Sequence, residues 1–167
     1  APCACSEPSV CAAPVKIAEF LKPQAVISHL AATSKPDVLR ELSSSLANAN
    51  PPVTLQRISQ VLEERERLGS TGIGEGVAIP HGKLAGLPAL SASFGVSREG
   101  IDFESIDGKR THLFFALVAP ENSAGLHLKA LARISRLFKN ARFRDAIIEA
   151  KTAPEIYELI AQEDAKA

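Results

Sequence analysis

The segment Gly69-Ser-Thr-Gly-Ile-Gly-Glu-Gly-Val-Ala-Ile-Pro-His-Gly-Lys83 carries the densest pattern in this chain of 167 residues. Its alternating glycines, Gly72, Gly74 and Gly76, are of the kind that lets backbone amides approach an anion. A dinucleotide-binding glycine loop follows a strand and opens a helix. This run instead follows a predicted helix and leads into a short predicted strand at 77–79, and it lacks the Gly-Lys-Ser/Thr ending of a Walker A loop. The sequence therefore excludes a nucleotide loop and leaves an anion-binding loop or a plain surface turn.

His81 is the candidate reactive residue of this segment. Pro80 fixes the backbone just before it, and Gly82 leaves the imidazole uncrowded. A neutral imidazole is nucleophilic near pH 7, since its ordinary pKa is about 6.5. A phosphorylated ring nitrogen is in turn a reactive donor, so phosphate can be passed on. The residues thus predict a phosphoryl carrier that holds its phosphate on His81.

Phosphoryl transfer depends mainly on in-line positioning and on neutralising the charge of the equatorial oxygens. Arg65 and Arg67 close the predicted helix before the glycine run, so either is a candidate donor. The run Glu63–Arg67 is also typical of a solvated helix end with charge pairs four residues apart. The phosphate-binding segment is expected to comprise Ser70, Thr71, Gly72, Gly74 and Gly76.

His127 lies on a predicted helix face that also carries Leu131, Ile134 and Phe138. From its own surroundings alone, a histidine on an apolar face is more typical of a structural residue than of a functional one. The remaining histidines, His29 and His112, fall in predicted strands and are expected to be structural.

Hydrophobic periodicity predicts helices toward both ends of the chain and strands in the middle. A short helix is expected at 16–21, longer helices begin after Ser34 and at Thr54, and a strand lies at 25–27. Three helices finish the chain, at 124–138, at 142–150 and from the capping box Thr152-Ala-Pro-Glu155. Strands are predicted at 91–97, around 101–103 and at 112–118, and the last is apolar enough to be buried on both faces. This pattern indicates one α/β domain.

Composition removes several classes of function. Nineteen basic residues balance nineteen acidic ones, which gives no electrostatic reason to expect a nucleic-acid partner. No apolar run approaches the roughly 20 residues of a membrane-spanning helix, and no signal peptide is recognised, so membrane insertion is not expected and the expected location is cytoplasmic. Residues 1–14 resemble a flexible leader whose three cysteines, Cys3, Cys5 and Cys11, lack a fourth metal ligand. Neither a metal nor a cofactor is expected.

Two segments resemble those of a known family. Arg65-Glu-Arg-Leu-Gly-Ser-Thr-Gly-Ile-Gly-Glu-Gly-Val-Ala-Ile-Pro-His-Gly-Lys83 resembles the active-site segment of the enzyme IIA domains of the fructose/mannitol class (type 2) of the phosphotransferase system. His127-Leu-Lys-Ala-Leu-Ala-Arg-Ile-Ser-Arg-Leu137 is similar to the second segment of that family. The similarity spans residues 15–164 and is strongest to the free-standing, nitrogen-regulatory branch.

The resemblance implies a mixed, roughly five-stranded β-sheet flanked by helices. It also implies a phosphohistidine at His81, with His127 in the same pocket and Arg65 steadying the phosphate. The phosphoryl donor would be a small histidine phosphocarrier protein (HPr-like), and the phosphorylation state would be read by regulatory target proteins.

Three other functions remain open from the sequence. A sugar-specific IIA protein that passes phosphate to a separate IIB component would have almost the same site. A metal hydrolase would use His81, His112 and His127, but these are not at the usual ligand spacing. A binding module without phosphoryl chemistry is the last alternative, and it predicts that His81→Ala leaves every activity intact.

Overall fold

The computed structural model describes residues 16–50 and 53–166. The predicted leader at 1–14, with its three cysteines, therefore lies outside the described residues.

The described residues form a six-stranded mixed sheet in the order β1-β5-β6-β3-β2, with β4 also paired to β6. The strands are β1 (Leu21–Ile27), β2 (Gly72–Gly74), β3 (Val77–Ala78), β4 (His81–Leu84), β5 (Ser91–Ile101) and β6 (Thr111–Pro120). Strand β6 is antiparallel to β5 on one side and parallel to both β3 and β4 on the other. The mixed sheet expected from the sequence is confirmed, with short strands added at its glycine-rich edge.

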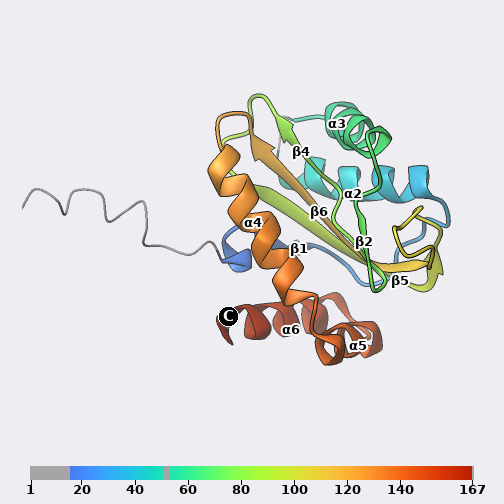
Figure 1. The fold of residues 1–167 in the computed structure, drawn as a ribbon. Coiled ribbons are helices and arrows are strands. Elements are labelled where there is room, and N and C mark those ends of the chain that lie inside the picture. The colour runs from blue at the N-terminus through green and yellow to red at the C-terminus, as the bar shows by residue number, and fades with distance from the viewer. Residues whose placement is uncertain (1–15, 51–52, 167) are drawn as a thin grey trace, which may run out of the picture.

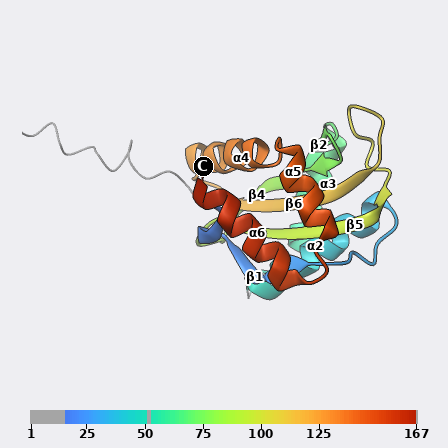
Figure 2. The ribbon, with the colours of Figure 1, turned by 90° about the horizontal axis from the view of Figure 1, so that it is seen from below.

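Helices cover both faces of the sheet, so that the domain has three layers (Figures 1 and 2). Helices α2 (Lys35–Ala49) and α3 (Leu55–Arg67) pack on one face. Helices α4 (Ala124–Leu137), α5 (Ala141–Glu149) and α6 (Ala153–Lys166) cover the other, together with the short 3₁₀ helix η2 (Ile17–Glu19). The expected α/β architecture is thus confirmed.

Strand β6 joins the two halves of the core. Its side chains alternate between the faces: Leu113, Phe115 and Leu117 pack in the cluster under α4–α6, whereas Phe114 and its alternate neighbours pack under α2 and α3. Each of these side chains is at most 1% exposed. Full burial of a side chain of this size contributes about 1.5–3 kcal/mol. The prediction that this strand is buried on both faces is confirmed.

Several helix ends follow the predicted capping chemistry. Thr54 caps α3, since its hydroxyl accepts a hydrogen bond from the amide of Arg57. The hydroxyl of Thr152 likewise accepts from the amide of Glu155 at the start of α6, which is one of the two hydrogen bonds of a capping box.

Three local predictions are wrong. The helix expected at 16–21 is limited to η2, and the chain enters β1 already at Leu21. Pro23 is accommodated there because β1 is an edge strand, where a missing amide donor costs little. His29 lies beyond the end of β1 and is exposed rather than in a strand. The two strands expected at 91–97 and 101–103 are largely one strand, β5, whose pairing with β6 is irregular between Val96 and Ile101.

Candidate functional site

His81 is the first residue of β4, where it pairs with Leu117 in the middle of β6. The carbonyl of Pro80 accepts a hydrogen bond from the amide of Leu117, 2.9 Å away. Strands β3 and β4 therefore share one edge of β6, and the Ile79-Pro80 step separates them. The sequence predicted a strand only over 77–79, whereas the structure places His81 itself on a strand. A strand fixes the imidazole more firmly than a loop does.

Gly82 brings helix α3 close to the strand that carries His81. A Cβ atom added at Gly82 would lie 2.3 Å from Cγ1 of Val61 in α3. The glycine predicted to leave the imidazole uncrowded thus also admits the helix that bears Arg65.

The tautomer of His81 follows from its hydrogen bond. Nδ1 of His81 lies 2.7 Å from the carbonyl oxygen of Ile79. A carbonyl oxygen only accepts hydrogen bonds, so Nδ1 carries the proton. In the neutral ring, Nε2 then holds the free lone pair and is the nucleophilic atom.

His127 lies in the first turn of α4 and is only 6% exposed. Its ring meets that of His81 edge to face, with the ring centroids 5.5 Å apart and the ring planes at 78°. Its Nε2 atom is buried and has no hydrogen-bond partner among the described residues. A buried polar atom without a partner is costly, and a ligand that supplied an acceptor or a donor there would relieve that cost. The structure therefore brings together the two histidines that the family resemblance associates.

Basic residues lie near both histidines and affect their pKa values. Burial lowers the pKa of His81, and the nearby Arg65 guanidinium lowers it further, while the Ile79 carbonyl and the Glu66 carboxylate act in the opposite direction. Burial, followed by the charges of His81 and Lys83, lowers the pKa of His127 to about 4. Both imidazoles are accordingly neutral at pH 7. Lys83 is an exposed basic residue that sequence analysis did not single out.

The glycine run forms a β-hairpin between β2 and β3. Glu75 and Gly76 have φ values of 59° and 78°, as a two-residue hairpin turn requires. The amide of Glu75 donates to the carboxylate of Asp107. Val77 pairs with β6 four residues before the partner of His81, which at the rise of a strand corresponds to roughly 13 Å. The turn is thus distant from His81, and phosphate binding by Gly74 and Gly76 stays a prediction.

The first residues of the run are nearer to the site but already bonded. Ser70 donates its hydroxyl proton to the carbonyl of Phe103 and accepts from the amide of Gly72. The amide and the hydroxyl of Thr71 both donate to the carboxylate of Glu66. Phosphate binding by Ser70, Thr71 and Gly72 also stays a prediction, and these amides would have to exchange partners to fulfil it.

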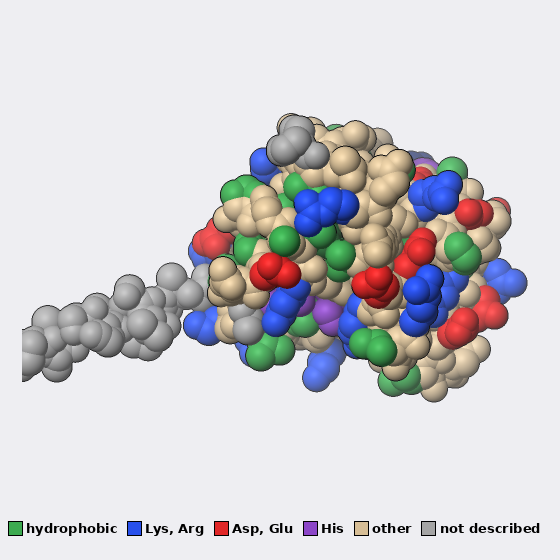
Figure 3. All heavy atoms as spheres, turned by 90° about the horizontal axis from the view of Figure 1, so that it is seen from above, with side chains coloured by type: hydrophobic (Ala, Val, Ile, Leu, Met, Phe, Trp, Pro, Cys, Tyr) green, Lys and Arg blue, Asp and Glu red, His purple; other side chains and the backbone are tan. Residues whose placement is uncertain are grey.

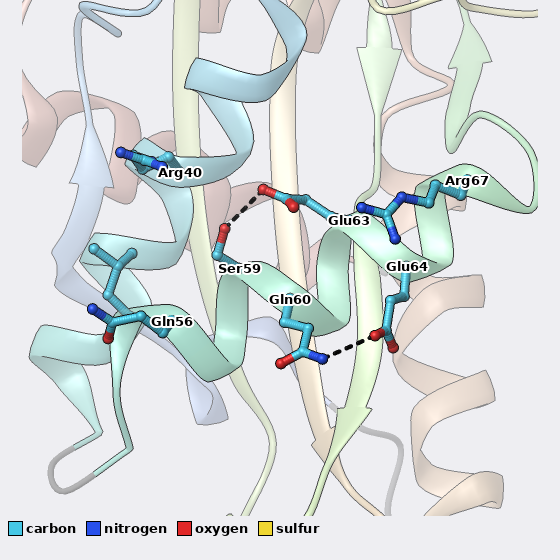
Figure 4. A pocket seen from close by; sticks show the side chains of 8 residues that line it. Arg40, Gln56, Ser59, Gln60, Glu63, Glu64 and Arg67 are labelled. Carbon is cyan, nitrogen blue, oxygen red and sulfur yellow. Dashed lines mark hydrogen bonds between the residues drawn. The ribbon is translucent and has the colours of Figure 1, made fainter.

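The charged end of α3 is only in part the solvated surface that its sequence suggests. A groove between α2 and α3 is lined by polar side chains that pair along α3, including Ser59 with Glu63 and Gln60 with Glu64 (Figure 4). Glu66, in contrast, is 6% exposed and faces the interior. The signal for this lay in its spacing, because Glu66 follows Ile58 and Leu62 along the apolar stripe of the helix. Arg65 is half-buried and donates to the carbonyl of Gly69.

The third histidine of the metal alternative is elsewhere. His112 lies near the start of β6 with its Nδ1 atom 2.9 Å from the carbonyl of Ser97, whereas His81 pairs further along that strand. Over residues 16–50 and 53–166, no three histidine, cysteine, aspartate or glutamate residues are grouped as a metal site requires. The geometry therefore gives the metal alternative no support.

Hydrophobic side chains are exposed beside the site. Leu126 and Leu128 flank His127 on α4 and are 40% and 67% exposed, and Leu68 at the end of α3 is 85% exposed. In Figure 3, histidine side chains reach the surface among basic, acidic and hydrophobic ones. Such a mixture is typical of a surface that contacts another protein.

Two neutral histidines, one on a strand and one on a helix, with the charge of Arg65 acting nearby, are what the sequence leads us to expect of a small α/β phosphoryl-transfer domain. Residues 19–163 match the family model described as "Phosphoenolpyruvate-dependent sugar phosphotransferase system, EIIA 2". The chain belongs to this family.

Individual relatives agree with that assignment. The chain is 38% identical over 151 residues to a "Nitrogen regulatory protein" of Bradyrhizobium diazoefficiens, covering 90% of this chain and 98% of the relative. It is 35% identical over 150 residues to the "PTS system fructose-specific EIIABC component" of Bacillus subtilis, covering 90% of this chain but only 24% of that longer protein.

Among solved structures, the nitrogen regulatory protein IIA-Ntr of Neisseria meningitidis superposes with a TM-score of 0.80 at 32% identity, covering 85% of this chain and 97% of that one. IIA mannitol of Escherichia coli shares the fold with a TM-score of 0.71 at 19% identity, covering 84% of this chain and 98% of that one. None of the helices in the part of the chain that the structure describes combines the length and apolarity needed to cross a membrane.

Proposed function

We propose that this chain is a phosphoryl carrier that accepts phosphate on Nε2 of His81. The observation that carries the proposal is the hydrogen bond from Nδ1 of His81 to the carbonyl of Ile79, which leaves Nε2 with the lone pair. The lowered pKa of His81 supports it, since the ring is neutral and nucleophilic at pH 7.

Transfer would proceed by in-line displacement. The lone pair of Nε2 forms a bond to phosphorus as the bond between phosphorus and the donor's nitrogen breaks, and the leaving imidazole takes the electron pair of that bond. His81 keeps its proton on Nδ1, because the Ile79 carbonyl accepts a hydrogen bond from Nδ1 throughout. No separate general base is then needed.

The neighbours of His81 would stabilise the phosphoryl group. Arg65 and Lys83 supply positive charge that already acts on the two imidazoles. Nε2 of His127, which has no hydrogen-bond partner among the described residues, would take up a proton from solvent and donate a hydrogen bond to a phosphoryl oxygen, since a dianionic phosphate favours the charged imidazole. In this arrangement His81 is the nucleophile, and His127 and Arg65 contact the phosphate.

The proposed donor is a small histidine phosphocarrier protein, as the family resemblance implies. We assign the chain to the regulatory, nitrogen-type branch, because the Bradyrhizobium nitrogen regulatory protein matches it over 98% of that protein's length. Regulatory target proteins would read the phosphorylation state. The cytoplasmic location expected from the sequence is part of this proposal.

A sugar-specific role is the alternative. The match to the Bacillus fructose component favours it, although the chain corresponds to only 24% of that protein. The mannitol IIA protein of Escherichia coli has been solved as a "Complex of enzyme IIAMTL and phosphorylated enzyme IIBMTL". A IIB component is therefore the partner to test against regulatory targets as the receiver of phosphate.

The proposal is tested by incubating the chain with phosphoenolpyruvate, enzyme I and the small histidine carrier. The expected result is a mass gain of one phosphate that is labile in acid, stable in base and absent from His81→Gln. His112→Gln is the matched control, since this histidine lies away from the pair, and it should be phosphorylated normally. Phosphate uptake by His81→Gln at the wild-type rate would show that the site is wrongly assigned.

A further inference from the structure

Glu66 is a buried acidic residue that the proposed chemistry does not use. It is 6% exposed, and its carboxylate accepts from three donors: the amide of Thr71 at 2.9 Å, the hydroxyl of Thr71 at 2.5 Å and the ammonium group of Lys35 at 3.0 Å. Burying a carboxylate costs several kcal/mol unless it is paired and hydrogen-bonded, as it is here. An apolar side chain at this position would continue the apolar face of α3 at a lower cost in free energy. The buried charge therefore suggests a functional role for Glu66.

The hydrogen bonds of Glu66 continue to the reactive imidazole. Thr71, held at both its amide and its hydroxyl by Glu66, offers its carbonyl to the amide of Ile79 at 3.0 Å. The carbonyl oxygen of Ile79 in turn accepts a hydrogen bond from Nδ1 of His81, 2.7 Å away. A continuous chain of hydrogen bonds thus runs from Lys35 through Glu66, Thr71 and Ile79 to His81.

The Lys35 end of this series of hydrogen bonds is also held in place. Lys35, at the start of α2, lies over the ring of Phe103 with its ammonium nitrogen 4.9 Å from the ring centroid. The carbonyl of the same Phe103 accepts from Ser70, the residue before Thr71. The segment that leads from α3 to β2 is therefore held from both sides, which limits the movement of the Thr71 carbonyl.

We propose that Glu66 is a positioning residue for the proposed phosphoryl transfer, acting through Thr71 and Ile79 to hold His81 with Nδ1 protonated and Nε2 aimed outward. Its negative charge also opposes the effect of Arg65 on the imidazole, since the two act on the pKa of His81 in opposite directions. In this role Glu66 supports the hydrogen bond between His81 and the Ile79 carbonyl, which leaves Nε2 as the reactive nitrogen. This inference rests on the proposed function of His81.

The test uses the full chain and phosphoramidate, a small chemical donor that phosphorylates histidine without a protein partner. Glu66→Gln keeps the shape of the side chain but removes the charge and one acceptor oxygen. We expect phosphate uptake to slow by about tenfold or more, as a small misplacement of a reactive group does. NMR of the unphosphorylated protein should show that His81 loses its uniform Nδ1–H tautomer and that the pKa of its imidazole falls.

Two further variants make the result specific. Glu64→Gln removes an exposed charge from the same helix and should leave the rate, the tautomer and the pKa of His81 at wild-type values. Thr71→Val breaks the link at the hydroxyl while it retains the charge of Glu66, and it should disturb the tautomer and slow uptake. This second variant provides the answer if Glu66→Gln does not fold.

The inference is overturned if folded Glu66→Gln or Thr71→Val matches Glu64→Gln in both tautomer and rate. Failure of the proposed function would look different. In that case wild-type protein would take up no phosphate on His81, while the tautomer measured by NMR would still report whether Glu66 positions the ring.

Discussion

The imidazole of His127 packs edge to face against that of His81, with ring centroids 5.5 Å apart, and its buried Nε2 atom finds no hydrogen-bond partner in the part of the chain that the structure describes. Both rings are neutral at pH 7. Their charged forms are disfavoured by burial and by the basic residues nearby. A phosphoryl group on His81 would reverse this balance, because its negative charge favours a protonated His127.

The first prediction concerns His127 as a donor to the phosphate. Phosphorylation of His81 should raise the pKa of His127 well above its value of about 4 in the free protein, as measured by NMR titration of the ring protons. His127→Gln should slow phosphate uptake by about tenfold to 10²-fold, since one stabilising donor is lost. A pKa of His127 that is the same before and after phosphorylation would remove it from the phosphate site.

The second prediction concerns stability against pH. An unfolded histidine titrates near pH 6.5, whereas His127 in the folded protein titrates near pH 4. Between these values the unfolded chain binds more protons, so the stabilisation is fully present above pH 6.5 and is lost as the pH falls toward 4. The shift corresponds to a loss of about 3 kcal/mol.

Because acidic groups also titrate in this range, the measurement is a difference. The free energy of unfolding of wild-type protein should fall more steeply between pH 6.5 and 4 than that of His127→Gln. Parallel curves for the two proteins would mean that His127 does not stay neutral in the folded state.

The third prediction separates charge from geometry at Arg65. Arg65→Ala should raise the pKa of His81, since the guanidinium lowers it, and should slow phosphate uptake by about 10²-fold. Arg65→Lys keeps the charge but loses the fork of donors that binds a phosphate bidentately. It should therefore leave the pKa of His81 near the wild-type value and still transfer slowly. Arg67→Ala, an exposed residue of the same helix end, is the control and should transfer normally.

Part of the fold and of the site could be predicted from the sequence, and physical reasons explain why the rest could not. The doubly buried strand β6 and the helices α2 to α6 follow from strong periodicity and from caps such as Thr54. His81 could be singled out because a proline and a glycine flank it. The short strands β2 and β4 were missed because a few glycine-rich residues carry no periodicity, and only their pairing with other strands makes them strands.

The roles of His127 and Glu66 beside His81 were harder to predict from the sequence. His127 reads as a structural residue on its own helix, and only the family resemblance associated it with His81. The contact itself is made by two segments distant in the chain. Glu66 was hidden in the charged run Glu63–Arg67, although its spacing from Leu62 placed it on the buried face. Burial of a carboxylate depends on partners such as Lys35 and Thr71, which come from other segments and leave no local signal.

The fourth prediction tests the close approach of α3 to β4. Gly82→Ala places a Cβ atom 2.3 Å from Cγ1 of Val61, so the helix or the side chain must move. Overpacking of this kind costs about 1–3 kcal/mol. Thermal unfolding should show that loss, and Val61→Ala in the same protein should restore part of it by making room. If the double variant is as unstable as the sum of its parts, the contact is not the cause.

The fifth prediction concerns the exposed leucines beside the histidines. Leu128 is 67% exposed on α4, next to the buried His127, and exposed apolar side chains near a reactive group favour contact with a protein donor. Leu128→Asp should therefore slow phosphorylation by the histidine carrier protein by about tenfold, a loss typical of one interface residue. Phosphoramidate needs no docking surface, so the same variant should react with it at the wild-type rate.

Equal slowing with both donors would mean that the substitution disturbs the histidine pair instead, and no slowing with either would place the donor's contact elsewhere. Ile106→Asp is the matched control, because this side chain is also exposed but lies in the turn between β5 and β6, and it should leave both rates unchanged.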